Sequence, residues 1–150
     1  MSSTRRHAGF TLIEIMAVVL IIGLLSTIVG TVVFSQVDRA RVATAKTQLK
    51  QLASNLEFYR LDNARYPSTA QGLDALVRKP TGEPVPKGYR PEGYVQGGRV
   101  PLDPWGEAFQ YQSPGTHNPY SFDLWSLGAD GAPGGEDNDA DVTNWADQEG

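Results

Sequence analysis

An uncharged stretch dominates the first quarter of the chain. No charged residue occurs from Ile15 to Val37, and these 23 residues would rise about 35 Å as an α-helix. The hydrocarbon core of a bilayer is about 30 Å thick, so the stretch predicts a membrane-spanning helix. One carboxylate, Glu14, lies at its N-terminal edge. Because a carboxylate in lipid costs at least ~2.5–3.5 kcal/mol, an acid there indicates a function.

The helical pattern continues beyond the apolar stretch. Apolar residues recur there at alternating steps of three and four, at Val42, Ala45, Leu49, Leu52, Leu56 and Tyr59. This spacing forms one stripe of an amphipathic helix, and the basic side chains between them fall mainly on other faces. We therefore predict one helix of about 50 residues, from near Thr11 to near Leu61. Its second half packs on a globular domain.

The rest of the chain has the pattern of short elements joined by turns. Ser68 and Gln71 form a capping-box signature for a short helix that ends near Arg78, and an irregular loop follows. Residues 108–112 and 120–127 alternate in the manner of antiparallel strands. The expected fold class is α+β, with a small antiparallel sheet packed on the helix stripe.

Composition adds two constraints. The chain has no cysteine, which excludes disulfides and thiolate metal sites. All 13 Lys and Arg residues lie in the first 99 residues, whereas residues 100–150 hold 10 acids and no Lys or Arg. This asymmetry suggests electrostatic complementarity between copies, although a merely solvated helix face would give the same pattern.

The N-terminus carries a combination of features with fixed spacing. A leader with Arg5 and Arg6 ends at Gly9, Phe10 follows, and Glu14 precedes the apolar helix. These features resemble the class III signal of type IV pilins and their relatives. The resemblance implies that a prepilin peptidase cuts after Gly9 and that the new amine of Phe10 is methylated. It also implies that Glu14 pairs with the N-terminal amine of a neighbouring subunit during assembly.

Two simpler interpretations compete with this one. A secretory signal peptide has an apolar core of roughly 7–15 residues and a cleavage site after that core, which does not match. A plain single-span anchor explains the length and the arginines but explains neither Glu14 nor the Gly9-Phe10 pair.

Motifs after the helix sharpen the resemblance. These motifs are Phe58-Tyr59-Arg60-Leu61-Asp62-Asn63, Tyr66-Pro67-Ser68-Thr69, Gln71-Gly72-Leu73, Leu102-Asp103-Pro104-Trp105-Gly106, Ser113-Pro114-Gly115 and Ser126-Leu127-Gly128-Ala129-Asp130-Gly131. Together they resemble the major pseudopilin of type II secretion systems. The implied organisation is a removed leader (1–9), a transmembrane and assembly helix (10–37) and a periplasmic pilin-like domain (38–150). The proline that often interrupts the helix in this family is replaced by Thr31, so its bend is not expected here.

Crowded carboxylates near the C-terminus suggest a metal site. Between residues 130 and 141 lie five acids and no cation, a set that a hard cation such as calcium would neutralise. An EF-hand is excluded because Val142 stands at its required glycine and Gln148 at its twelfth position. The resemblance instead implies a pseudopilin calcium loop within 126–145. Its implied ligands are the Leu127 carbonyl, Asp130 and Asp137, with Asp139 and Asp141 as rivals for the third acid. The alternative is a solvated acidic tail.

Catalysis and nucleic-acid binding have little support. His117 lies in a turn-like Gly-Thr-His-Asn-Pro segment, and neither a nucleophile elbow nor a phosphate-binding glycine loop is present. An acidic domain also argues against nucleic acid as a partner.

The sequence therefore predicts a structural protein and not an enzyme. The resemblance implies insertion in the Gram-negative inner membrane and then assembly into a periplasmic homo-oligomeric filament, the pseudopilus. Its implied partners are the prepilin peptidase, minor pseudopilins and the inner-membrane secretion platform, and its role is the export of folded proteins across the outer membrane. Two alternatives stay open: a surface type IV pilin, and a membrane-anchored calcium-binding module that never polymerises.

Overall fold

The computed structural model describes residues 9–145, and for 28–35 it describes the backbone alone. The chain divides into two compact units, Met1–Val37 and Asp38–Gly150. The described elements are helix α1 (Leu12–Asn63), 3-10 helix η1 (Leu73–Leu76) and strands β1 (Gln110–Gln112), β2 (Asp123–Ser126) and β3 (Val142–Thr143). The predicted α+β class, with one long helix and a small antiparallel sheet, is confirmed.

Helix α1 has identifiable signals at both ends. Thr11 precedes the helix, and its hydroxyl accepts a hydrogen bond from the backbone N–H of Glu14 at 3.3 Å. This is the N-cap contact of a Thr-x-x-Glu sequence, which satisfies one of the unpaired N–H groups of the first turn. At the other end, Ala64 has a φ of 61°, which takes the chain out of the helical conformation after Asn63.

The predicted stripe forms the core of the second unit. Its five C-terminal members, Ala45, Leu49, Leu52, Leu56 and Tyr59, are each at most 3% exposed. Val42 packs at the edge of this core as a partly buried residue. Burying a Leu or Phe side chain contributes about 1.5–3 kcal/mol, so this one helix face supplies much of the stabilisation of the domain.

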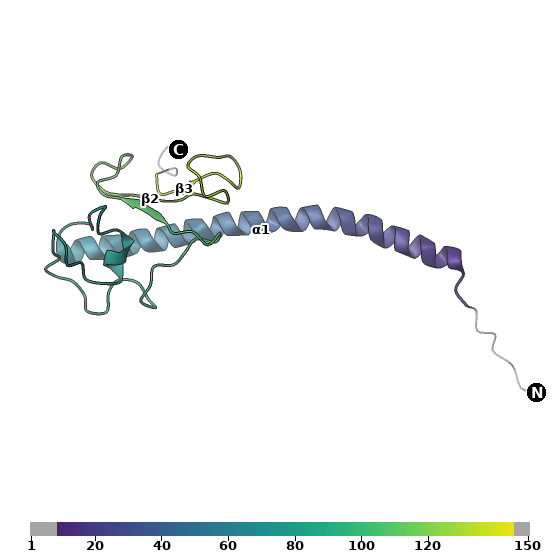
Figure 1. The fold of residues 1–150 in the computed structure, drawn as a ribbon, viewed down its shortest axis with the longest axis horizontal. Coiled ribbons are helices and arrows are strands. Elements are labelled where there is room, and N and C mark those ends of the chain that lie inside the picture. Colours follow the sequence, from purple (N-terminus) through teal and green to yellow (C-terminus); the bar gives the residue numbers. More distant parts are fainter. Residues whose placement is uncertain (1–8, 146–150) are drawn as a thin grey trace, which may run out of the picture. The chain divides into compact units, whose positions relative to one another are not determined.

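The sheet is small and antiparallel, with the order β1-β2-β3. Tyr111 pairs with Leu124 between β1 and β2, and Ser126 pairs with Val142 between β2 and β3. The central strand has Leu124 fully buried in the core beside Phe122 and Phe109. Figure 1 shows these strands along the C-terminal half of α1.

The two predicted strands are present but shorter than expected, and the third was missed. β1 occupies the last three residues of the predicted strand 108–112, and β2 lies within the predicted strand 120–127. β3 is only two residues long, too short for an alternating pattern to reveal it.

The predicted capping box forms, although the helix that follows is shorter than predicted. The Ser68 N–H donates to Oε1 of Gln71 at 3.0 Å, and the Gln71 N–H donates to the Ser68 hydroxyl at 3.2 Å. Gly72 then adopts a φ of 59°, which no right-handed helix allows. The turn therefore ends there, and only the four residues of η1 follow.

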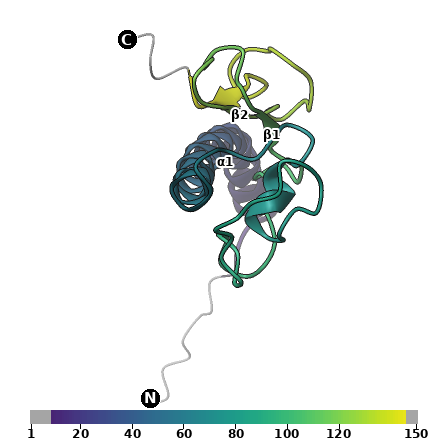
Figure 2. The ribbon, with the colours of Figure 1, turned by 90° about the vertical axis from the view of Figure 1, so that its left-hand side faces the viewer.

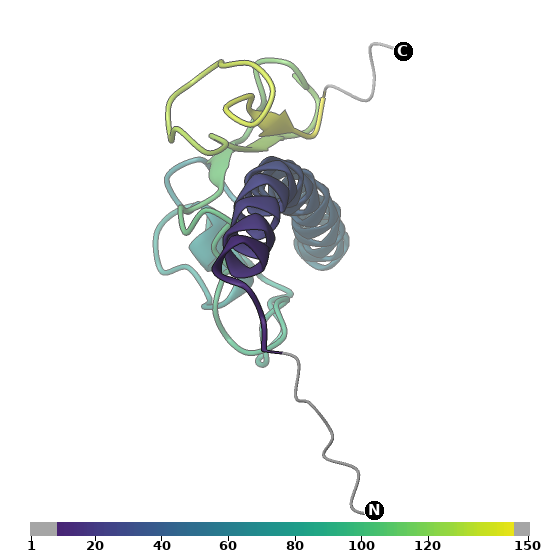
Figure 3. The ribbon, with the colours of Figure 1, turned by 90° about the vertical axis from the view of Figure 1, so that its right-hand side faces the viewer.

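Tyrosines hold the irregular loop between residues 79 and 98 against α1. The Tyr59 and Tyr94 rings lie 5.2 Å apart, and Tyr89 meets Tyr94 edge-on at 5.4 Å. Burial raises the pKa of Tyr59 to about 12. Views along α1 show the sheet on one side of the helix, and η1 and this loop on another (Figures 2 and 3).

Candidate functional site

The N-terminal site is a helix start with an exposed apolar surface. Phe10 is 79% exposed, and the large apolar side chains from Leu12 to Leu25 are exposed too. Contiguous apolar surface of this extent marks a site that lipid or another protein chain covers. Among the residues with described side chains, no helical segment is both long enough and apolar enough to count as a membrane span.

Glu14 lies in the first turn of α1, four residues after Phe10. Its backbone is fixed by the Thr11 cap, and its side chain is exposed. A carboxylate in the first turn also interacts favourably with the helix dipole. The Thr-x-x-Glu spacing is a local capping signal that the sequence itself carries.

The predicted calcium ligands lie on one loop between β2 and β3. Leu127 follows β2 directly, Asp130, Asp137 and Asp139 are exposed, and Asp141 is half-buried next to β3. Within residues 9–145, three or more acidic or histidine side chains nowhere come close enough together to hold a metal ion. The structure places the predicted ligands on the same loop but does not bring their carboxylates together.

Backbone hydrogen bonds fold this acidic loop back on itself. The Ala129 N–H donates to the Asn138 carbonyl at 3.1 Å, and the Asp141 N–H donates to the Gly134 carbonyl at 3.0 Å. Gly128 has a φ of 70°, and a Cβ there would lie 2.8 Å from the Ala140 carbonyl oxygen. Glycine is therefore required where the two arms of the loop meet.

One carboxylate oxygen in the loop is left without a partner. Asp141 accepts a hydrogen bond from the Gly134 N–H on Oδ2 at 3.1 Å, but its Oδ1 is buried and unpartnered among the described residues. A buried unpaired polar atom is costly, and carboxylate oxygens are the ligands that calcium prefers. A cation bound beside Asp141 would give this oxygen a partner.

The acidic loop also contacts α1. The side-chain amide of Asn138 donates to Oδ2 of Asp38 at 3.0 Å. Asp38 is the first residue of the second unit, and its other carboxylate oxygen lies 3.8 Å from Arg41. The loop is thus tied to the helix where the globular domain begins.

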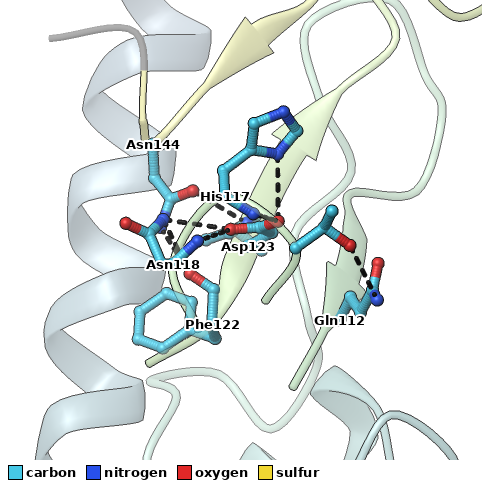
Figure 4. A network of polar contacts seen from close by, with 8 residues as sticks. Gln112, His117, Asn118, Phe122, Asp123 and Asn144 are labelled. Carbon is cyan, nitrogen blue, oxygen red and sulfur yellow. Dashed lines mark hydrogen bonds and ion pairs between the residues drawn. The ribbon is translucent and has the colours of Figure 1, made fainter. Parts of the chain in front are cut away.

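A cluster that we term the C-terminal clasp fixes the end of the described chain (Figure 4). Its centre is Asp123, which is 1% exposed. Oδ2 of Asp123 accepts the His117 backbone N–H at 2.8 Å and lies 3.1 Å from His117 Nδ1. Oδ1 accepts the backbone and side-chain N–H groups of Asn118, each at 3.0 Å. The carboxylate therefore organises the turn that precedes β2.

The same cluster anchors the residues after β3. Asn144 donates through its amide to the Phe122 carbonyl at 3.1 Å and accepts the Leu124 N–H at 3.0 Å. The Trp145 ring stacks on the His117 ring, with centroids 4.1 Å apart and planes 4° apart. His117 was predicted to be only a turn residue, and its separation of 28 residues from Trp145 left no local signal for this contact.

The clasp sets the protonation of its central acid. Burial alone would raise the pKa of Asp123, but the hydrogen bonds from His117 and Asn118 hold that pKa below its usual value. His117 and Asp123 resemble a catalytic acid–base pair, yet no hydroxyl hydrogen-bonds to the His117 ring among the described residues. The pair therefore has the geometry of a structural contact.

Comparison with known protein families shows which family this chain belongs to. A family model for the type II secretion system protein G matches residues 32–145, and a model of the prokaryotic N-terminal methylation motif matches residues 4–30. The chain belongs to the type II secretion system protein G family. The resemblance inferred from the sequence motifs is therefore confirmed.

Individual relatives agree with this assignment. The type II secretion system core protein G of Pseudomonas aeruginosa is 55% identical over 141 residues, which cover 94% of this chain and 96% of the relative. The protein of the same name from Vibrio cholerae is 45% identical and covers 97% of this chain and 96% of its own length.

A solved structure supports the fold. The crystal structure of the major pseudopilin from the type 2 secretion system of enterohaemorrhagic Escherichia coli has a TM-score of 0.64 and 44% identity. The match covers 75% of this chain and 92% of that one. The predicted role as a pseudopilus subunit is confirmed, and the family is one of structural secretion-system components.

The clasp yields a prediction about stability. The pKa of Asp123 is lower in the folded chain than in the unfolded chain. The Asp123 carboxylate therefore stabilises the fold above the unfolded pKa of about 3.9, and this stabilisation is lost as the pH falls through the lower folded pKa. We expect Asp123→Asn to lower the free energy of unfolding by about 1.5–3 kcal/mol at pH 7, since it removes charged hydrogen bonds. The difference from wild type should shrink below about pH 4.

Denaturant unfolding of the full chain in detergent, followed by tryptophan fluorescence, measures both effects. Asp74→Asn is the matched control, because its carboxylate is exposed and its ion pair with Arg78 is on the surface. Equal stability of the Asp123→Asn and Asp74→Asn variants at pH 7 would contradict the role of the clasp.

Proposed function

We propose that this subunit polymerises through the first half of α1, after cleavage behind Gly9 and methylation of Phe10. The observation that carries the proposal is the exposed apolar surface from Leu12 to Leu25. Before assembly, lipid of the inner membrane covers this surface, and in the filament the same surface packs on neighbouring helices. The match to the methylation motif over residues 4–30 supports the processing step.

Glu14 directs subunit docking in this proposal. Cleavage creates a positively charged amine on Phe10, and Glu14 of one subunit pairs with that amine on the next. Both charges would be buried in an apolar filament core, where each compensates the desolvation of the other. A misaligned subunit leaves both charges unpaired, so the pair selects the correct register.

Removal of the carboxylate tests this role. We expect Glu14→Ala and the isosteric Glu14→Gln to be cleaved normally but to assemble poorly, because an unpaired buried charge costs about 3–5 kcal/mol. Mass spectrometry of the membrane fraction measures cleavage, and electron microscopy counts filaments. Filaments at wild-type frequency in Glu14→Gln would refute the charge-pairing role, while a failure of cleavage would place Glu14 in peptidase recognition instead.

We further propose that the acidic loop binds calcium through the Leu127 carbonyl, Asp130, Asp137 and Asp141. The unpartnered Oδ1 of Asp141 supports this residue over Asp139 as the third acid. Bound calcium would neutralise the crowded carboxylates, and these residues would hold the loop closed between β2 and β3. Because Asn138 donates a hydrogen bond to Asp38, the closed loop would also stabilise α1 at the residue where the globular domain begins.

Calcium dependence of stability tests the loop. Calcium at about 100 times its dissociation constant should add about 2.7 kcal/mol to the free energy of unfolding. We expect Asp130→Ala, Asp137→Ala and Asp141→Ala to lose most of this gain, whereas Glu136→Ala keeps it. Thermal unfolding in calcium, magnesium and chelator measures the effect. An equal loss of the calcium-dependent stabilisation in all four variants would indicate a diffuse acidic cluster. No stabilisation of the wild-type chain by calcium would contradict a calcium site in this loop.

The remaining assignments extend the family relationship. We propose a single-pass protein of the Gram-negative inner membrane whose C-terminal domain lies in the periplasm, and which has no enzymatic activity. Its proposed partners are further copies of itself, minor pseudopilins, the prepilin peptidase and the inner-membrane secretion platform. The structural role of His117 supports the absence of catalysis, and the family match favours a pseudopilin over a surface pilin.

A further inference from the structure

A large groove lies beside the C-terminal half of α1, away from the acidic loop. It has a volume of about 1370 Å³ and runs between the helix and the segment from Arg90 to Leu102. Leu52, Asn55 and Phe58 line it from the helix, and Tyr94 and Val100 line it from the opposite wall.

The amide side chain of Asn55 lines the groove without a hydrogen-bond partner among the described residues. Asn55 is only 7% exposed, yet its side chain makes no hydrogen bond to any part of the chain that the structure describes. It occupies a helix face on which its neighbours Leu52, Leu56 and Tyr59 are core residues. Because the Asn55 amide atoms still open onto the groove, the amide is free to hydrogen-bond with a molecule bound there. One donor and one acceptor together match the backbone of an extended peptide.

The charges at the groove indicate an acidic occupant. Arg90 is already paired with Asp62, whereas Arg99 is exposed and has no ion pair among residues 9–145. Glu92 also lines the groove and would repel an acid near it, so the Arg99 end is where a carboxylate fits.

We propose that this groove binds the C-terminal segment 146–150 of a second copy of the chain. That segment reads Ala-Asp-Gln-Glu-Gly, so it presents two carboxylates and no cation. Five extended residues span at most about 17 Å, and the helix rises about 10 Å from Gln51 to Phe58, so the segment can follow the groove. The inference rests on the proposed polymerisation, which supplies the second copy.

The arrangement of the domain favours another copy over the same chain. In two opposite views, the yellow C-terminal part of the chain and the teal-green loop that precedes residue 100 lie on different sides of α1 (Figures 2 and 3). Trp145 is fixed on the first side by its stack on His117. A contact between two different patches of identical subunits is heterologous, and such contacts propagate into open filaments.

Cysteine crosslinking tests the contact directly, because the chain has no cysteine of its own. Two differently tagged full-length chains are co-expressed with the secretion system, one with Gln96→Cys in the groove and the other with Gln148→Cys in the tail. We expect a disulfide-linked dimer that carries both tags. The control pairs Gln148→Cys with Tyr120→Cys, a fully exposed position outside the groove, and should give little crosslinking.

Charge-reversal variants give a second test of the contact between the groove and the tail. Arg99→Glu should lower the crosslinked fraction about fivefold, the equivalent of a surface pair of about 1 kcal/mol. Asp147→Lys with Glu149→Lys in the tail should restore it. Arg65→Glu, which reverses an exposed cation outside the groove, should leave the yield unchanged.

Filaments are counted by electron microscopy in every sample, which separates two kinds of failure. Filaments without the mixed-tag dimer would overturn the groove proposal while polymerisation stands. An equal effect of Arg99→Glu and Arg65→Glu would also overturn it. An absence of filaments from the unmodified chain would overturn the proposed polymerisation itself.

Discussion

The fold depends on the burial of one helix stripe. Ala45, Leu49, Leu52, Leu56 and Tyr59 turn towards a sheet whose three strands contain only two to four residues each. So small a sheet is not stable without a partner. The helix provides that partner, and the loops attach to it through Tyr89, Tyr94 and the Asp38–Asn138 contact. The same helix continues towards its N-terminus into the exposed apolar segment from Leu12 to Leu25.

The parts with local periodicity could be predicted from the sequence, and the parts made by distant contacts could not. The helix stripe follows from steps of three and four, and α1 ends within two residues of its predicted limits. The Ser68–Gln71 capping box forms because its two bonds are local. The clasp joins His117 to Trp145, and the groove joins Asn55 to Arg99, across separations that carry no local pattern.

The C-terminal region is held without a disulfide. The chain has no cysteine, yet Asp123, Asn144 and the His117–Trp145 stack fix the residues on both sides of the sheet. The acidic loop lies between these anchored ends, so the strands are fixed on both sides of it. This explains why exposed carboxylates in the loop are compatible with a stable domain.

The most direct test of assembly through α1 is a helical reconstruction, by electron cryomicroscopy, of filaments assembled from the native chain. Assembly through this helix predicts that the apolar halves of α1 pack along the filament axis, with the globular domains outside. The Glu14 carboxylate of each subunit should lie within about 4 Å of a neighbouring Phe10 amine, the separation of a salt bridge. Filaments in which Glu14 faces solvent, or in which the globular domains alone make the contacts, would contradict it.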